Sequence, residues 1–196
     1  MNQLKAAAII GNGPSREPID LFTLALNATT FGCNALYRDF GVLDYLVAID
    51  EGMIKEIESH RSLLPNTTII FPPEDERWES AEYSVPRRRS NAGMNAMSEA
   101  IKLGHNVLYC LGFDFILEGK ESVGNVYKGT KNYGPETAAQ EADSYWRIRY
   151  FEWFARQHPD VTIIMVIPDD GKNHQIQADN VKGMRLSKFT SKLDKG

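Results

Sequence analysis

The chain alternates between short apolar runs and longer segments of mixed polarity. Residues 6–10 are Ala-Ala-Ala-Ile-Ile, a run without polar alternation that is typical of a strand buried on both faces of a parallel sheet. Further runs predict strands at residues 29–33, 43–49, 67–71, 107–111 and 161–167. The segments between them predict a turn or helix at residues 17–27 and helices at residues 53–60, 92–103 and 136–158. This alternation predicts a single α/β domain over residues 1–196, with a mostly parallel, doubly wound sheet.

Three segments fall outside this alternation. The glycine-rich segment, residues 118–135, contains four glycines, two tyrosines and three lysines, and a long loop of this kind after a sheet strand predicts a lid over a binding site. Residues 168–196 are polar, and we interpret them as a C-terminal tail, with a partner-binding arm as the alternative. Residues 72–89 have two consecutive prolines, many charges and no clear period, which predicts an irregular excursion.

Composition narrows the classes of function. The 196 residues are 42% apolar and 24% charged, as in an ordinary soluble domain, and a net charge of −4 gives no support for a nucleic-acid surface. We expect no membrane span and no signal peptide, because no apolar run is long enough. Cys33 and Cys110 lie in apolar runs and indicate reduced core residues of a cytoplasmic chain. No metal-ligand spacing is present, and a homo-oligomer is left open.

The first predicted strand ends abruptly at Gly11-Asn12-Gly13-Pro14-Ser15, which we call the first loop. Gly11 and Gly13 let a ligand approach the backbone closely, Pro14 fixes its own φ, and Ser15 offers a hydroxyl. Ligands of open α/β sheets bind outside the carboxyl ends of the strands, so the first loop predicts a phosphate or nucleotide site. It is neither a GxGxxG fingerprint nor a P-loop with its lysine, and an ordinary strand-to-helix turn is the alternative.

Polar residues recur at the ends of other predicted strands. Asn34 follows the second, Asp50 the third and Asp114 the fifth, while Asn91 caps a predicted helix whose N-terminal N–H groups suit a phosphate. Because parallel strands place their carboxyl ends at one edge, we expect these groups to converge there, where amides can bind ribose and base edges. Each residue alone is also an ordinary turn former or cap.

Three blocks of the chain carry a family resemblance. They are Ile9-Ile10-Gly11-Asn12-Gly13-Pro14-Ser15, Phe31-Gly32-Cys33-Asn34, and residues 89–115, with Arg89-Ser90-Asn91-Ala92-Gly93 and Leu108-Tyr109-Cys110-Leu111-Gly112-Phe113-Asp114-Phe115. These blocks resemble bacterial sialyltransferases of the Campylobacter lipooligosaccharide type, glycosyltransferase family 42. The resemblance covers most of residues 6–115 and is weak thereafter. It implies a Rossmann-like domain that transfers a sugar from a CMP- or other nucleotide-linked donor to a saccharide hydroxyl, without a metal or further cofactor.

The resemblance also implies roles for individual residues. Those that would bind the nucleotide are Gly11, Asn12, Gly13 and Ser15 of the first loop, Asn34, the phosphate-holding turn Asn91, Ala92 and Gly93, and Gly112 and Asp114 near the cytidine. Ala92 stands where the family has a serine, and Asp50 stands where it has an asparagine near donor and acceptor.

Two positions depart from the family pattern. Ile116 replaces a tyrosine, and Tyr127 or Tyr133 of the glycine-rich segment could supply the phenol that steadies the leaving phosphate. The family's general-base histidine has no counterpart in residues 137–144, although an inverting transfer needs a base for the acceptor hydroxyl. Our candidates for the catalytic groups are His174 and Asp50, with Glu141 and Asp143 as alternatives.

Two other functions stay open on the sequence. The first loop and the Gly-x-Asp strand end are also similar to pterin pyrophosphokinase-like phosphotransferases, which would need Mg²⁺ on Asp50 and Asp114. A catalytically inactive nucleotide-binding module is the third possibility. Asp50-Glu51 does not form a DxD metal motif, which favours the metal-free reaction.

Overall fold

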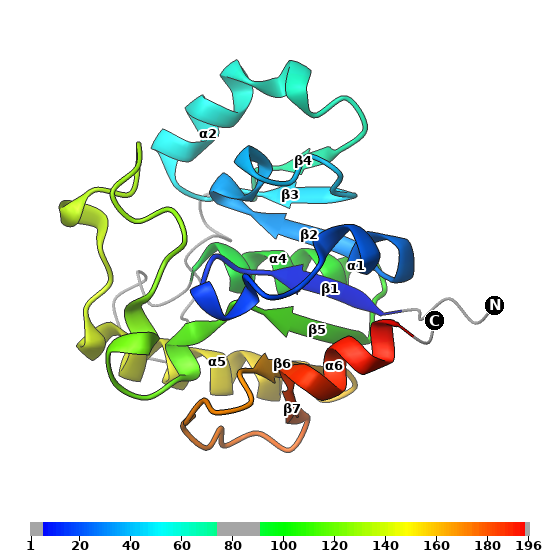
Figure 1. Cartoon of the computed structure of the whole chain (residues 1–196), viewed down its shortest axis with the longest axis vertical. Helices are drawn as coiled ribbons and strands as arrows, with labels where there is room; N and C mark the ends of the chain where they lie inside the picture. Colours follow the sequence, from blue (N-terminus) through cyan, green and yellow to red (C-terminus); the bar gives the residue numbers. More distant parts are fainter. Residues whose placement is uncertain (1–5, 74–90, 195–196) are drawn as a thin grey trace.

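The computed structural model describes residues 6–73 and 91–194, which form a seven-stranded sheet with helices on both faces (Figure 1). The strands are β1 (Ala7–Ile10), β2 (Thr29–Cys33), β3 (Tyr45–Val47), β4 (Thr68–Ile70), β5 (Val107–Leu111), β6 (Thr162–Ile167) and β7 (Val181–Arg185). Their order is β4-β3-β2-β1-β5-β6-β7, and every pairing between these strands is parallel. The predicted Rossmann-like, doubly wound α/β fold is confirmed.

β1 lies at the point where the strand order reverses. The chain runs outward from β1 through β2 and β3 to β4, and then returns to β5 on the other side of β1. Ile9 accordingly lies opposite Phe31 on one side and Cys110 on the other. Ligands of open α/β sheets bind at such a reversal, outside the carboxyl ends of the strands. The ends of β1, β2 and β5 are therefore the first place to look for a site.

Two helical layers bury the two faces of the sheet. The helices α4 (Ala92–Lys102) and α5 (Glu141–Gln157) cover one face, and α1 (Leu21–Asn27), α2 (Glu51–Ser59) and α6 (Leu186–Leu193) cover the other. Ile9 packs toward the first layer and Ile10 toward the second, and both are fully buried. Burial on both faces explains why the strands carry unbroken apolar runs. Met94 and Met97 of α4 are buried in the first layer.

Local capping decides where the helices begin. The Asp20 carboxylate accepts a hydrogen bond from the Phe22 N–H (3.0 Å), so α1 starts four residues later than predicted, after the 3-10 turn η1 (Pro14–Arg16). Similarly, α5 starts at Glu141 because the turn η7 (Pro135–Thr137) interrupts the predicted helix over residues 136–158. All four predicted helices exist. Turns that contain proline delay the starts of α1 and α5, whereas α4 starts at Ala92 as predicted and α2 starts two residues early, at Glu51.

The prediction of a polar tail over residues 168–196 is wrong, as is the prediction that the sheet ends at residue 167. β7 pairs with β6 from Ile163–Val181 to Ile167–Arg185, and α6 then packs Phe189 and Leu193 against the sheet. β7 lies at the edge of the sheet and is half exposed, so its residues include lysine, glycine and arginine in place of an apolar run. An edge strand of this kind lacks the apolar pattern on which the prediction depended.

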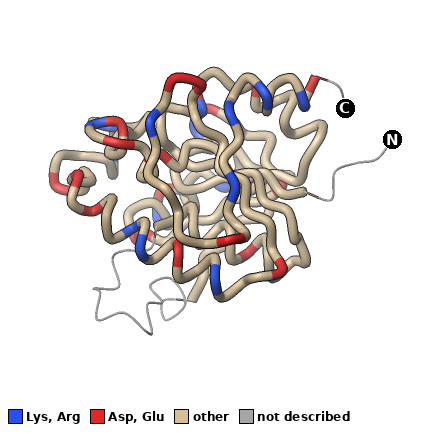
Figure 2. The backbone as a smooth tube through the Cα atoms, turned by 90° about the horizontal axis from the view of Figure 1, so that it is seen from below, with Lys and Arg blue, Asp and Glu red and all other residues tan. Residues whose placement is uncertain are grey.

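Lysine and arginine positions are interspersed with aspartate and glutamate positions along the backbone drawn in Figure 2. Cys33 and Cys110 are both free and buried, which confirms their predicted place in the core. Within the described ranges, no helix is long and apolar enough to cross a membrane. The predicted excursion at residues 72–89 lies almost wholly outside the described residues, as do Arg89 and Ser90 of the family resemblance.

Candidate functional site

The carboxyl ends of β1 and β5 meet in a tightly packed turn. The Gly11 N–H donates to the Leu111 carbonyl (2.7 Å), and the Gly13 N–H donates to the Gly112 carbonyl (2.9 Å). A Cβ atom at Gly11 would lie 2.6 Å from the Gly112 carbonyl oxygen, and Gly112 itself has a φ of +66°. These glycines are required because two backbones approach each other closely. Their contact with a ligand stays a prediction.

Asp114 fastens the first loop to the end of β5. Its carboxylate accepts hydrogen bonds from the Ser15 backbone N–H (3.1 Å) and from the Ser15 hydroxyl. Gly13 makes room, because a Cβ atom there would lie 2.3 Å from the carboxyl carbon of Asp114. Burial raises the pKa of Asp114 above its ordinary value, although the Ser15 hydrogen bonds act in the opposite direction. Ser15 and Asp114, both predicted to bind the nucleotide, thus hold each other in place.

Asn12 and Asn34 present unpartnered amide oxygens at the ends of β1 and β2. The Asn12 Nδ2 donates to the Cys33 carbonyl (3.1 Å), and the Asn34 Nδ2 donates to the Asp50 carboxylate (3.1 Å). Both Oδ1 atoms are buried and have no hydrogen-bond partner among the described residues. Asn34 also has a φ of 49°, in the left-handed region that costs energy for residues other than glycine. Since buried polar atoms are nearly always paired, the two oxygens indicate a ligand that donates hydrogen bonds.

The N-terminus of α4 lies at the same edge. Asn91 is its N-cap, and the Asn91 Oδ1 accepts a hydrogen bond from the Met94 N–H (2.9 Å). A Cβ atom at Gly93 would lie 2.7 Å from the Phe113 ring, so this turn packs directly against the residue after Gly112. Asn91 thus serves as an ordinary helix cap, while the first N–H groups of α4 remain suited to an anion. The phosphate-binding role of Asn91, Ala92 and Gly93 stays a prediction.

The glycine-rich segment lies over the first loop. The Val126 N–H donates to the Asn12 carbonyl (2.8 Å), and Tyr127 is only 4% exposed. The Tyr127 hydroxyl donates to the Asp39 carboxylate (2.6 Å) and accepts from the Arg16 Nη2 (3.1 Å). Burial, together with the hydrogen bond to Asp39, raises the pKa of Tyr127. The Tyr127 hydroxyl is already engaged, and its predicted nucleotide contact stays a prediction.

Tyr133 brings a second phenol to the same edge. The centroids of the Tyr133 and Tyr127 rings are 5.7 Å apart. The Tyr133 hydroxyl lies beside the Asn34 amide and the Ala35 backbone. Burial raises the pKa of Tyr133 to about 12. No hydrogen bond of full geometry reaches the buried hydroxyl among the described residues, although the adjacent Ala35 backbone and Asn34 side chain act to lower its pKa. Of the two predicted tyrosines, Tyr133 therefore keeps its hydrogen-bonding capacity next to the unpartnered Asn34 oxygen.

A buried ion pair supports α2 beside the site. Arg38 ends the 3-10 turn η2 (Asn34–Arg38), and its Nε and Nη2 atoms donate to the two carboxylate oxygens of Glu56, both at 2.8 Å. The Tyr37 hydroxyl donates to the same carboxylate (2.7 Å). Burial acts to raise the pKa of Glu56, but the hydrogen bonds from Tyr37 and Arg38 outweigh it and lower the pKa. The charged form of Glu56 is therefore favoured despite its burial.

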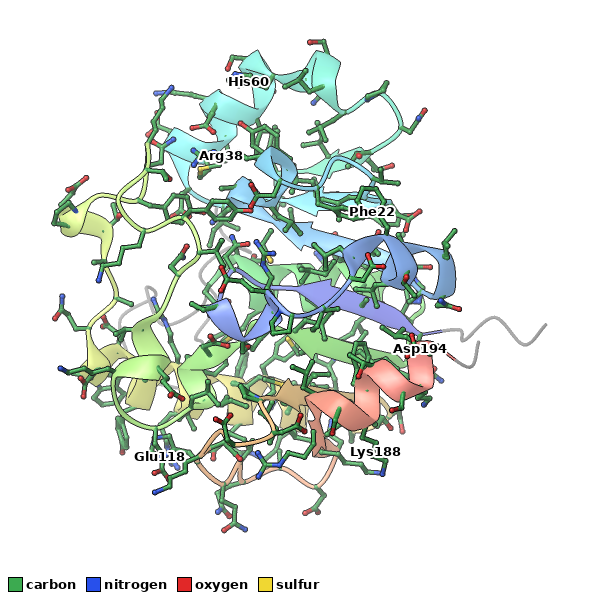
Figure 3. All side chains as sticks on the ribbon, viewed as in Figure 1. Phe22, Arg38, His60, Glu118, Lys188 and Asp194 are labelled. Carbon is green, nitrogen blue, oxygen red and sulfur yellow. The ribbon has the colours of Figure 1, made fainter. Side chains whose placement is uncertain are left out.

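The same ion pair holds the glycine-rich segment to α2, where Figure 3 labels Arg38. Arg38 donates to the Thr130 hydroxyl (2.8 Å) and to the Lys131 carbonyl (2.9 Å). The Asn132 Nδ2 donates to the Glu56 carboxylate (2.8 Å). The network was not predicted, because Glu56 is one of several charged residues in α2 and Arg38 stands next to Asp39, so neither is conspicuous in the sequence.

The two predicted catalytic residues, Asp50 and His174, are not neighbours in the sheet. Asp50 follows β3, and His174 follows β6, where its backbone N–H donates to the Ile116 carbonyl (2.9 Å). Both are exposed. β3 and β6 are four strand spacings apart, about 19 Å at about 4.8 Å each. Of the alternatives, Asp143 caps α5 by accepting from the Gln140 N–H (2.8 Å). A role as catalytic base stays a prediction for each of them.

Magnesium was expected only for the phosphotransferase alternative, on Asp50 and Asp114. In the structure these carboxylates accept hydrogen bonds from Asn34 and Ser15 respectively, on different strands. No group of three or more histidine, cysteine, aspartate or glutamate side chains within residues 6–73 and 91–194 could hold a metal ion.

The fold and this edge define an α/β protein with a candidate ligand site at a topological switch point. No family model matches the sequence, and no curated protein matches it. Among solved structures, the chain is similar to a mutant form of the alpha-2,3/8-sialyltransferase CstII, with a TM-score of 0.48 and 15% identity over 82% of this chain and 80% of that one. A likeness at this level does not establish a shared activity.

Proposed function

We propose that the protein binds a nucleotide-linked sugar at the carboxyl edge of its sheet and is a sialyltransferase-like glycosyltransferase. The observation that carries the proposal is the pair of buried, unpartnered oxygens, Asn12 Oδ1 and Asn34 Oδ1, at the ends of β1 and β2. Acceptors of this kind suit the hydroxyl groups of a sugar or ribose and the amino group of a base. Their place at the strand reversal supports a nucleotide as the ligand.

Other described groups have roles in the proposed transfer. The first N–H groups of α4 would face the phosphate, and the Tyr133 hydroxyl would donate a hydrogen bond to the leaving group. The glycine-rich segment, which lies over the first loop, would exclude water and so protect the activated sugar from hydrolysis. We assign the base to Asp50 ahead of His174, because Asp50 adjoins the Asn34 amide at the site.

A thermal-shift panel of nucleotides and nucleotide sugars, in EDTA and in Mg²⁺, tests the proposal. We expect CMP or a CMP-linked sugar to raise the unfolding midpoint equally in both buffers. A ligand at a hundredfold excess over its dissociation constant adds about 2.7 kcal/mol of stability. A response only to a nucleoside triphosphate with Mg²⁺ would favour the phosphotransferase, and no response to any nucleotide would end the proposal.

Matched variants locate the binding. Asn12→Ala and Asn34→Ala should each lose the shift, whereas Asn66→Ala, at an exposed asparagine, should keep it. If a CMP-linked sugar binds but is neither transferred nor hydrolysed, even with a range of saccharide acceptors, the inactive nucleotide-binding module becomes the better description.

A further inference from the structure

Arg16 is a buried cation with few partners. It ends the turn η1, directly after the first loop, and its side chain is only 6% exposed. A guanidinium carries five N–H donors. Within the described part of the chain, its one hydrogen-bond acceptor is the neutral Tyr127 hydroxyl (3.1 Å), and the Nε atom is buried without a partner. Most of the hydrogen-bonding capacity of this side chain is unused.

The nearest carboxylate compensates this charge only weakly. Asp39 Oδ2 lies 3.9 Å from the Arg16 Nη2, and the Asp39 side chain is 54% exposed. That oxygen already accepts a hydrogen bond from the Tyr127 hydroxyl (2.6 Å). A buried charge without a close, hydrogen-bonded partner is costly, so a protein that keeps one has a use for it.

The position of Arg16 connects it to the candidate site. Arg16 directly follows Ser15 of the first loop, and its Nη2 atom donates to the Tyr127 hydroxyl (3.1 Å). The N–H of the neighbouring residue, Val126, donates to the Asn12 carbonyl (2.8 Å). The guanidinium is therefore held by the segment that covers the end of β1, where the Asn12 oxygen is unpartnered.

We propose that Arg16 is a ligand-binding residue that receives an oxyanion group, a phosphate or carboxylate, of the molecule bound at this edge. The inference deepens the proposed function and rests on it for the location of the ligand. Arg16 supplies unused donors in a planar fork that fits such groups, while Asn12 and Asn34 supply unused acceptors. The complementary ligand has hydroxyl or amino groups beside an anion.

Before the anion arrives, Tyr127 and Asp39 hold the guanidinium. An incoming oxyanion would compete with Asp39 for the same positive charge, because both are negatively charged hydrogen-bond acceptors. Removing the Asp39 charge should therefore strengthen anion binding. A purely structural ion pair between Arg16 and Asp39 predicts no such gain.

The first experiment measures the unfolding midpoint of the full chain in inorganic phosphate, with chloride at equal ionic strength as the blank. We expect a saturable rise in the wild type and at least a tenfold higher apparent Kd in Arg16→Met. Arg61→Met, which removes an equal charge from an exposed residue, should keep the wild-type response. No phosphate-specific rise in the wild type, or an unchanged rise in Arg16→Met, would overturn the inference.

Asp39→Asn tests the inference independently, including the case in which Arg16→Met does not fold. It should bind phosphate several-fold more tightly than the wild type, and an equal or weaker affinity would refute the competition. Acetate in place of phosphate separates the two oxyanion classes, since the preferred one should shift the midpoint at lower concentration.

Comparing the binding of CMP with that of phosphate separates this inference from the proposed function. If phosphate binding depends on Arg16 but CMP binds no better than phosphate, the anion site holds and the nucleotide-sugar proposal fails. If CMP binds equally well to the wild type and Arg16→Met, and neither phosphate nor acetate binding depends on Arg16, the nucleotide proposal holds and the role of Arg16 is refuted.

Discussion

Arg16 and Arg38 flank the ring of Tyr127, at 5.8 and 5.7 Å from its centroid, yet their surroundings differ sharply. Each ends a 3-10 turn that follows a strand, β1 for Arg16 and β2 for Arg38. Arg38 is paired through two hydrogen bonds with the buried Glu56 carboxylate and also bonds the glycine-rich segment. Among the described residues, the Arg16 guanidinium makes one hydrogen bond, to the Tyr127 hydroxyl, and the Asp39 carboxylate lies 3.9 Å from its Nη2 atom.

The difference separates a structural network from a candidate binding group. α2 supplies Glu56 to the Arg38 guanidinium, and the donors and acceptors of that network are matched. Fully satisfied polar networks rigidify a structure. Around Arg16 the unmatched atoms include a donor, its own Nε, and an acceptor, Asn12 Oδ1, which stay available to a ligand. Arg38 therefore holds the glycine-rich segment in place, whereas Arg16 keeps unpaired hydrogen-bonding groups at the candidate site.

The largest effect should follow from breaking the satisfied network. Glu56→Ala leaves the Arg38 guanidinium partly buried without its carboxylate, and removing one member of a buried pair costs about 3–5 kcal/mol. Urea denaturation should show that loss in the free energy of unfolding. Glu58→Ala, at an exposed position of the same helix, should stay within about 0.5 kcal/mol of the wild type. A loss of less than about 1 kcal/mol in Glu56→Ala would contradict the structural role of the network.

Replacement by methionine should lower the free energy of unfolding much more at Arg38 than at Arg16. Arg38→Met leaves the Glu56 carboxylate buried and unpaired, and we expect a loss of about 3 kcal/mol. Arg16→Met removes a buried charge that has few partners, so its stability should lie within about 1 kcal/mol of the wild type or above it. Paired urea titrations compare them, and equal losses would show that Arg16 is as structural as Arg38.

Acid should weaken the Glu56 network. The pKa of Glu56 is lowered from its usual 4.5 in the folded state, so its contribution to stability is present above that value and lost as the pH falls below it. Glu56→Gln lacks this contribution at every pH. Melting midpoints between about pH 7 and about pH 3 should show the wild type approaching Glu56→Gln as the pH falls. A constant difference across that range would mean that the Glu56 charge is not what stabilises the network.

Much of the fold was predictable because burial on two faces leaves a clear pattern. The apolar runs at residues 29–33 and 107–111 correspond residue for residue to β2 and β5. β7 was missed because an edge strand has one unpaired side and carries Lys182 and Arg185 among its five residues. β4, at the opposite edge of the sheet, was predicted because it is Thr-Ile-Ile, so the charged residues and exposure of β7, and not its edge position alone, hid this strand.

The candidate site was predictable in its location but not in its contacts. Asn12, Asn34 and Asp114 come to one edge because parallel strands share a direction. Ser15 and Asp114 pair across 99 positions of the chain, and a hydrogen bond of that range leaves no local pattern. Arg16 carried a signal that could have been used, since a charged residue directly after a predicted phosphate loop is a candidate anion ligand.

The smallest change in stability should come from Asn34, where structure and binding can be separated. Asn34→Gly removes a hydrogen bond to Asp50 of about 1 kcal/mol but also relieves a φ of 49° that costs a comparable amount, so the free energy of unfolding should change by less than about 1 kcal/mol. Asn180 provides the contrast, because its Nδ2 lies 2.9 Å from three backbone carbonyls, those of Ala155, His158 and Val161. Asn180→Ala should lose about 1–3 kcal/mol and keep nucleotide binding, whereas Asn34→Gly should keep its stability and lose binding at least about tenfold. Urea denaturation and CMP titration on both variants test this, and a destabilised Asn34→Gly that still binds CMP would show that the Asn34 oxygen serves the fold and not the ligand.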